Sequence, residues 1–141
     1  MHNVEHHVGR LVEVRLASPL NAEEVQQFVL ELNAVLKKLP GKYVGLVDLH
    51  DAHVFVPAIS ESLIQLLSAA AARVERAAFL INESAIFALQ VERILRSSNS
   101  DNRRAFRNTD EAVKWLGEAL TPEERVRLKT VTMPKPVKAA R

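Results

Sequence analysis

Residues 43–49 of the chain read YVGLVDL, and this stretch decides the fold class that the sequence predicts. The run is almost wholly apolar, with the turn residues PGK at 40–42 before it and polar residues at 48–51 after it. A short apolar run with such boundaries is typical of a strand that is buried on both faces. Because helices must cover such a strand on both sides, the sequence predicts a layered α/β domain.

The composition of the chain narrows its function class. Its 141 residues are 48% hydrophobic and 26% charged, which fits one globular domain with an ordinary core. A formal charge of +2 does not indicate a nucleic-acid partner. The absence of cysteine excludes disulfides, thiolate metal sites and a cysteine nucleophile, and it fits a reducing cytoplasm. No apolar run approaches the roughly 20 residues of a membrane span, so we expect a cytoplasmic protein without stable membrane insertion.

The N-terminal half outside residues 43–49 predicts a hairpin followed by a helix. Residues 4–8 and 11–16 are expected to be strands joined by a turn at Gly9 and Arg10. Asn21, with Glu24 three residues later, predicts a helix cap, and Pro40 and Gly41 end the helix. The apolar residues of this helix have the spacing of one buried face: Val25, Phe28, Val29, Leu32, Val35, Leu36 and Leu39.

The C-terminal half alternates helices and strands. We expect a helix over residues 59–74, a strand over 77–81, a helix over 85–97 and an edge strand over 104–107. A further helix is expected to be capped by Thr109, and a short one to start at Thr121, Pro122 and Glu124. The expected inward-facing residues of the helix over 59–74 are Ile59, Leu63, Leu66, Leu67, Ala70 and Val74. Those of the helix over 85–97 are Ile86, Leu89, Ile94 and Leu95.

These elements predict one domain with a mixed, mostly parallel sheet of about five strands. The order is strand, strand, helix, strand, helix, strand, helix, strand, helix, with helices packed on the sheet. The domain is expected to span residues 1–129. Residues 130–141 contain two prolines and no apolar periodicity, so we expect a mobile tail there.

The C-terminal motif RRAFRNTDEAVKWL, residues 103–116, resembles the SpoIIAA-like (STAS/SEC14-like) α/β family. The resemblance is carried by Phe106, Thr109-Asp110, Glu111-Ala112 and Trp115-Leu116, together with the order of elements. It implies a sandwich of sheet and helices with no common enzyme activity. Its better-known members are phosphorylation-controlled protein-binding modules of bacterial signalling, and others share the fold of SEC14-type lipid carriers. Those signalling members carry an Asp-Ser-Ser-Gly-type turn before the second helix, where this chain reads VPAISES with Ser60 and Ser62.

Two groups of residues could bind an ion. His50 and His53, with Asp48 and Asp51, follow a predicted strand at its carboxyl end, where open α/β sheets bind ligands, so they are candidate metal ligands. The alternative is that they form local hydrogen bonds in a loop. Five arginines are candidates for binding an anion or an acidic partner: Arg93, Arg96, Arg103, Arg104 and Arg107. Interleaved acidic residues favour the alternative, a solvated and self-neutralised surface.

Three functions remain open. The first is a non-enzymatic, protein-binding regulatory module, because the chain has no Gly-rich phosphate loop and no nucleophile elbow, and no cofactor is expected. Its contact residues would be Ser60, Ser62, His50 and Phe55, and its partner another protein or a second copy of the chain. The second is a carrier of a small apolar ligand or lipid, suggested by Val54, Phe55 and Val56. The third is a metal-assisted hydrolase that uses His50 and His53.

Overall fold

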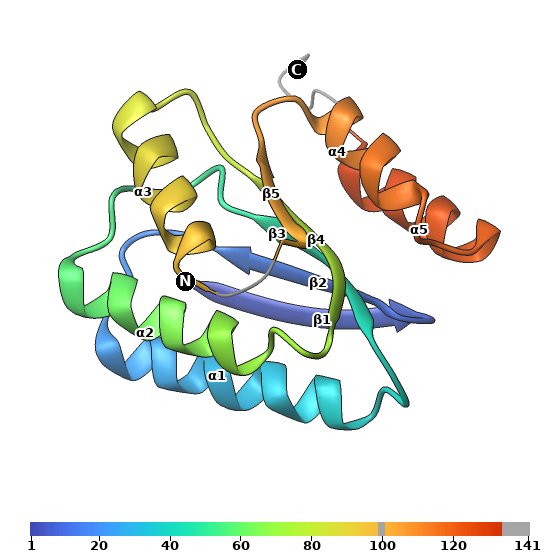
Figure 1. Cartoon of the computed structure of the whole chain (residues 1–141), viewed down its shortest axis with the longest axis horizontal. Helices are drawn as coiled ribbons and strands as arrows, with labels where there is room; N and C mark the ends of the chain where they lie inside the picture. The colour runs from blue at the N-terminus through green and yellow to red at the C-terminus, as the bar shows by residue number, and fades with distance from the viewer. Residues whose placement is uncertain (99–100, 134–141) are drawn as a thin grey trace, which may run out of the picture.

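The computed structural model of the chain describes residues 1–98 and 101–133, which form one mixed five-stranded sheet with five helices. The strands lie side by side in chain order: β1 (His2–Val8), β2 (Leu11–Leu16), β3 (Tyr43–Asp48), β4 (Val74–Leu80) and β5 (Arg103–Phe106) (Figure 1). The β1–β2 hairpin is antiparallel, and every other pair is parallel. The predicted α/β class, the mixed sheet and the edge position of β5 are therefore confirmed.

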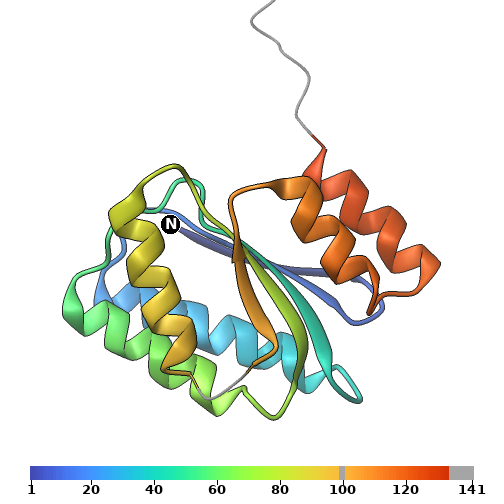
Figure 2. The same ribbon diagram turned by 45° about the horizontal axis from the view of Figure 1, so that its top comes forward.

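The helices divide between the two faces of the sheet. α1 (Ala22–Lys37), α2 (Pro57–Ala69) and α3 (Ala85–Arg96) cover one face, and α4 (Thr109–Gly117) and α5 (Pro122–Thr132) lie on the other (Figure 2). The connections from β2 to β5 advance across the sheet in one direction. Right-handed crossovers therefore place the three connecting helices on the same face.

β3 is the strand between the two apolar cores, as its sequence predicts. Successive side chains of a strand point to opposite faces. Tyr43 therefore joins the core under α1, α2 and α3, while Val44 and Leu46 join the core under α4 and α5. All three side chains are buried.

Two predicted helix starts are confirmed by their hydrogen bonds. The side chain of Asn21 accepts a bond from the backbone N–H of Glu24 at 2.8 Å and caps α1. Thr121 and Glu124 form a reciprocal capping box at the start of α5. In both cases a side-chain oxygen satisfies backbone N–H groups that a first helical turn leaves free.

The Glu124 carboxylate also joins α5 to the β1–β2 turn. It accepts the backbone N–H of Arg10 at 2.6 Å, 114 residues away in the chain, and that of Thr121 at 2.8 Å. Gly9 has φ +55°, and a Cβ atom there would lie 2.0 Å from the Glu124 Oε2 atom. Glycine is favoured at this turn, because L residues rarely adopt this backbone conformation and a Cβ atom would displace the Glu124 carboxylate.

Three predicted boundaries or caps are wrong. The second helix ends at Ala69, and Val74 begins β4, where it pairs with Tyr43 of β3. Strand pairing therefore extends β4 toward its N-terminus by residues 74–76, which follow an alanine run at 69–72 that suits a helix. The cap of α4 is Asn108 and not Thr109, because the Asn108 side chain reaches the N–H of Glu111 at 3.0 Å.

The predicted inner face of α3 is also wrong in part. Ile94 and Leu95 are buried, but their partners are Phe87 and Val91, while Ile86 and Leu89 lie on the outside. Phe87, Val91 and Ile94 have the four-three spacing of one helix face. The larger aromatic side chain therefore sets the face that packs on the sheet.

At the C-terminal end, α5 continues through Thr132, so Thr130–Thr132 belong to a helix and not to the expected tail. Residues 134–141 lie outside the described part of the chain. Within the residues that the structure describes, no helix combines the length and the apolar composition needed to cross a membrane.

Candidate functional site

The loop between β3 and α2 is fastened to α3. The backbone N–H of Phe55 donates to the Oε1 atom of Gln90 at 2.8 Å, and the Nε2 atom of Gln90 donates to the carbonyl of Phe55 at 2.8 Å. The Phe55 and Phe87 rings meet edge to face, with centroids 5.5 Å apart. Phe55 is therefore a buried attachment residue, which corrects its prediction as an exposed contact residue.

Four large apolar side chains of the attached loop and of α3 are exposed, and we call them the loop–α3 apolar surface. Their exposed fractions are 49% for Val54, 60% for Val56, 70% for Ile86 and 71% for Leu89. Val54 and Val56 precede and follow Phe55 in the loop, and Ile86 and Leu89 belong to α3, the helix to which Gln90 fastens that loop. The sequence predicted that Ile86 and Leu89 would be core residues. The spacing of Phe87, Val91 and Ile94 is the signal that could have placed them outside.

His50 and His53 do not form a metal-binding group with their acidic neighbours. The Nδ1 atom of His50 lies 2.8 Å from the Oδ1 atom of Asp48, whereas Asp51 forms an ion pair with Arg15. The backbone N–H of His53 donates to the Ser18 hydroxyl at 2.8 Å. Among the described residues, none of these side chains belongs to a cluster of three or more metal-ligating groups. The local hydrogen-bonding interpretation fits these contacts better.

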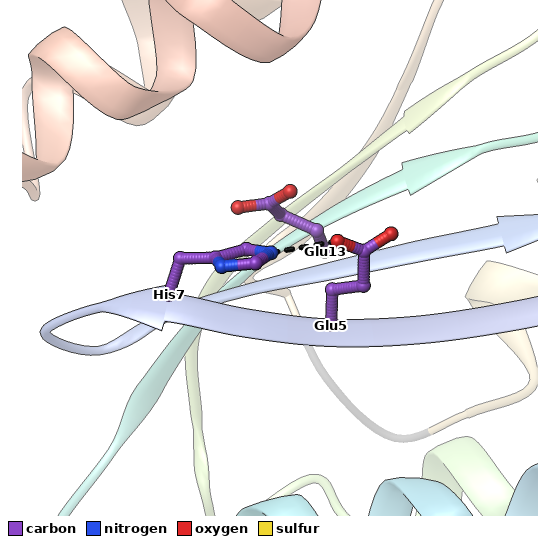
Figure 3. A group of neighbouring side chains, drawn as sticks. All are labelled: Glu5, His7 and Glu13. Carbon is purple, nitrogen blue, oxygen red and sulfur yellow. Dashed lines mark hydrogen bonds and ion pairs between the residues drawn. The ribbon is translucent and has the colours of Figure 1, made fainter.

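The structure instead brings Glu5, His7 and Glu13 together on β1 and β2, with ligand atoms within 4.8 Å of one another (Figure 3). Glu5 pairs directly across the strands with Glu13. The His7 Nε2 atom lies 2.6 Å from the Glu5 carboxylate and lowers the pKa of Glu5. Carboxylates and imidazole can bind zinc. However, Arg127 of α5 already donates to both oxygens of Glu13, at 2.8 and 2.9 Å. His7 and Arg127 thus offset the repulsion between two facing glutamates.

Ser60 and Ser62 lie inside α2 and not at its start. The helix begins at Pro57 with Val56 as its N-cap residue, and Ser60 donates its backbone N–H to the Val56 carbonyl at 3.0 Å. The Ser62 hydroxyl donates to the Ala58 carbonyl at 3.0 Å. The helix therefore starts two residues earlier than the predicted residue 59, so Ser60 does not occupy the N-cap position.

The five candidate arginines separate on folding. Arg93, Arg96, Arg104 and Arg107 are exposed, and the Arg104 guanidinium also stacks on Trp115 at 4.9 Å from the ring centroid. Arg96, Arg103 and Arg104 line a surface hollow of about 610 Å³ between α3 and β5, together with Glu92 and Asp101. Arg93 and Arg107 do not line this hollow.

Arg103 differs from the other four because it is only 6% exposed. Its NH2 atom donates to the Leu67 carbonyl at 2.7 Å, and its NH1 atom to the Ser98 hydroxyl at 3.1 Å. In the part of the chain that the structure describes, its Nε atom has no hydrogen-bond partner. Burial lowers the pKa of the guanidinium, while the neighbouring Tyr43 opposes that shift. The solvated-surface interpretation is therefore wrong for Arg103. Alternation along β5 places Arg103 and Arg104 on opposite faces of the sheet, but the predicted strand, 104–107, did not include Arg103.

Arg103 and Tyr43 are the polar side chains that line an otherwise apolar cavity of about 60 Å³. The cavity lies between the sheet and the helices α1, α2 and α3. Tyr43 is buried as well, and this burial raises the pKa of its hydroxyl. The site thus combines an apolar interior with a hydroxyl and a guanidinium at one end.

Comparison with known proteins adds no family to this description. No protein-family model matches the chain, and no curated protein matches it.

Proposed function

We propose that this chain is a non-enzymatic protein-interaction module that binds its partner through the loop–α3 apolar surface. The observation that carries the proposal is the exposure of Val54 and Val56 in a loop that Phe55 and Gln90 fasten to α3, together with the exposure of Ile86 and Leu89 on that same helix. Grouped exposed apolar side chains mark interaction sites, whereas single ones are ordinary. The loop also follows the carboxyl end of β3, the edge at which open α/β sheets bind ligands.

The resemblance of residues 103–116 to the SpoIIAA-like (STAS/SEC14-like) family supports a regulatory role of this kind in bacterial cytoplasmic signalling. Phosphorylation would be the associated control. A phosphate on Ser60 or Ser62 would add a charge of roughly −1.5 to −2 within the first two turns of α2. Since α2 starts directly after Val56, that charge would lie close to the apolar contact surface.

The test replaces Ile86 and Leu89 together by lysine. Both side chains are exposed, so the Ile86→Lys/Leu89→Lys variant should melt within a few degrees of wild type. In cross-linking capture from the source cell, partners recovered by the wild type should fall at least tenfold. Ser60→Asp and Ser62→Asp, measured in the same assay, report whether negative charge on α2 regulates the contact.

The matched control is Val126→Lys, which places the same charge at an exposed apolar position on α5, on the other face of the sheet. It should keep every partner of the wild type. An unchanged partner set in the double variant, or an equal loss in the control, would contradict the assignment of the contact surface.

A second candidate function, the carriage of a small apolar ligand, is supported by the cavity under α1, α2 and α3. Its volume of about 60 Å³ is smaller than the roughly 150 Å³ that holds one benzene molecule. The cavity in this conformation therefore fits a ligand of a few heavy atoms better than a whole lipid. Native mass spectrometry of freshly purified protein tests this candidate, because a co-purified small molecule supports it and a clean protein mass counts against it.

A further inference from the structure

Arg103, one of the side chains that line the cavity, carries a buried hydrogen-bond donor that is not used. The residue is more than nine-tenths buried, and among the described residues its Nε atom has no partner, while NH1 and NH2 are bonded. A buried donor without an acceptor costs roughly 1–3 kcal/mol, and more when the group is charged. A bound molecule that presents an acceptor to Nε would remove this cost.

The charge of Arg103 is also only partly offset. The carbonyl of Leu67 lies in the last turn of α2, and Ser98 follows the end of α3, so two helix C-termini face the guanidinium with their negative dipole ends. In the described part of the chain no carboxylate forms an ion pair with Arg103, and Tyr43 is the ionisable group that supports its charge. The remaining positive charge favours an anionic acceptor.

The cavity lies next to the surface hollow between α3 and β5. Arg103 and Leu95 line both the internal cavity and the hollow between α3 and β5. Arg96 lies in the same hollow and adds a second cation, opposed there by Glu92 and Asp101. An amphiphilic molecule could therefore keep its charged end at Arg103 and place its apolar end under the sheet.

We propose that this cavity binds a short-chain monocarboxylate. The carboxylate would accept hydrogen bonds from the Nε atom of Arg103 and from the Tyr43 hydroxyl, and the hydrocarbon tail would lie among the apolar side chains. The inference rests on the second candidate function, the carriage of a small apolar ligand. A cavity of about 150 Å³ holds the six carbons of benzene, so about 60 Å³ has room for a tail of roughly two or three carbons, with the carboxylate outside this volume, toward the hollow that Arg103 also lines. Propionate and butyrate have this size.

The experiment titrates the full chain with butyrate and follows the Arg103 Nε–H signal in ¹⁵N-correlated NMR. The signal should shift on binding, because the donor gains an acceptor. Butyramide, which has the same size without the charge, should bind at least tenfold more weakly, and decanoate should not enter. Binding of xenon tests separately whether the cavity accepts an apolar ligand of any kind.

Two variants complete the test. Arg103→Met should reduce butyrate affinity at least tenfold while xenon still binds, and Arg93→Met, at an exposed position outside the cavity and the hollow, should leave both unchanged. If Arg103→Met does not fold, Val91→Leu replaces it. The larger leucine side chain fills part of the cavity and should abolish the binding of both butyrate and xenon.

The results separate the two proposals. If xenon enters but butyrate does not shift the Arg103 signal, the carboxylate inference fails and the carrier candidate stands. If neither binds, both fail. Equal binding of butyrate and butyramide, or unchanged butyrate binding in Arg103→Met, would also overturn the role of the guanidinium.

Discussion

At the scale of single residues, polar side chains connect elements that lie far apart in the sequence. His2 on β1 is a clear case, because its Nδ1 atom lies 3.0 Å from Glu24 and its Nε2 atom 2.8 Å from Glu31, both on α1. The imidazole side chain is only 14% exposed. The hydrogen bonds to Glu31 and then to Glu24 raise the pKa of His2 above its ordinary value, so the protonated form is preferred in the fold.

This shift predicts a pH-dependent stability. Because the pKa of His2 in the fold lies above its unfolded value of about 6.5, protonated His2 stabilises the fold. This stabilisation is complete below about pH 6.5 and is lost as the pH rises through the folded-state pKa. His2→Gln should therefore lower the melting temperature more at pH 5.5 than at pH 8.5. Differential scanning calorimetry at both values checks this result.

Glu31→Gln provides the matched control for His2, since Glu31 is the largest cause of the shift. It should reduce the difference in melting temperature between the two pH values without removing the imidazole. A His2→Gln penalty that is equal at pH 5.5 and pH 8.5 would show that the ring acts only through packing.

At the scale of elements, the sequence predicts well wherever one pattern dominates. α1 has a cap, a single apolar face and a terminating Pro-Gly, and the structure confirms all three signals. α3 has two competing apolar stripes, and the prediction placed Ile86 and Leu89 on the inner one although Phe87, Val91 and Ile94 have the spacing of one helix face. The α3 part of the loop–α3 apolar surface was therefore missed, because Ile86 and Leu89 lie on the stripe that the sheet leaves uncovered.

α5 depends on few contacts, which predicts that it opens separately from the rest. Leu128 is its fully buried apolar side chain, and most of its other residues are polar. Leu128→Ala should cost about 2–5 kcal/mol in the packing of α5. Hydrogen exchange should then accelerate together in α5 and at the Arg10 amide that Glu124 binds, and remain slow in β3 and β4.

Val126→Ala is the control for Leu128, because it removes an exposed side chain from the same helix. It should leave all of these exchange rates unchanged. If Leu128→Ala accelerates β3 and β4 as much as α5, the molecule unfolds as one unit and α5 has no separate opening.

At the scale of the whole molecule, two cores share one sheet, and β3 belongs to both. Its apolar sequence was sufficient to predict the layered architecture. The position of Arg103 inside the larger core was not predicted, because its acceptors, Leu67 and Ser98, are set by where α2 and α3 end. Those helix ends follow from tertiary packing and strand pairing.

Leu46→Asp should unfold the whole domain. The side chain is buried between the sheet and the α4–α5 layer, where a carboxylate has no partner. The expected loss exceeds about 4 kcal/mol, against a total of about 5–15 kcal/mol for an ordinary domain. Circular dichroism should show no cooperative melting transition.

Leu30→Asp introduces the same charge at an exposed leucine of α1 and should melt close to the wild type. Cooperative melting of Leu46→Asp near the wild-type temperature would show that β3 is not the strand on which both layers depend.

The bond between Glu124 and the turn at Gly9 and Arg10 affects how the chain assembles during synthesis. Since every strand pairs with the one before it in the sequence, the sheet can grow strand by strand as the chain leaves the ribosome. The turn at Gly9 and Arg10, however, cannot form its hydrogen bond to Glu124 until that residue, 114 positions after Arg10, has been synthesised. A nascent chain that ends before α5 can therefore contain all five strands of the sheet without the hydrogen bond between Arg10 and Glu124. The turn between β1 and β2 is fixed only when α5 has been synthesised.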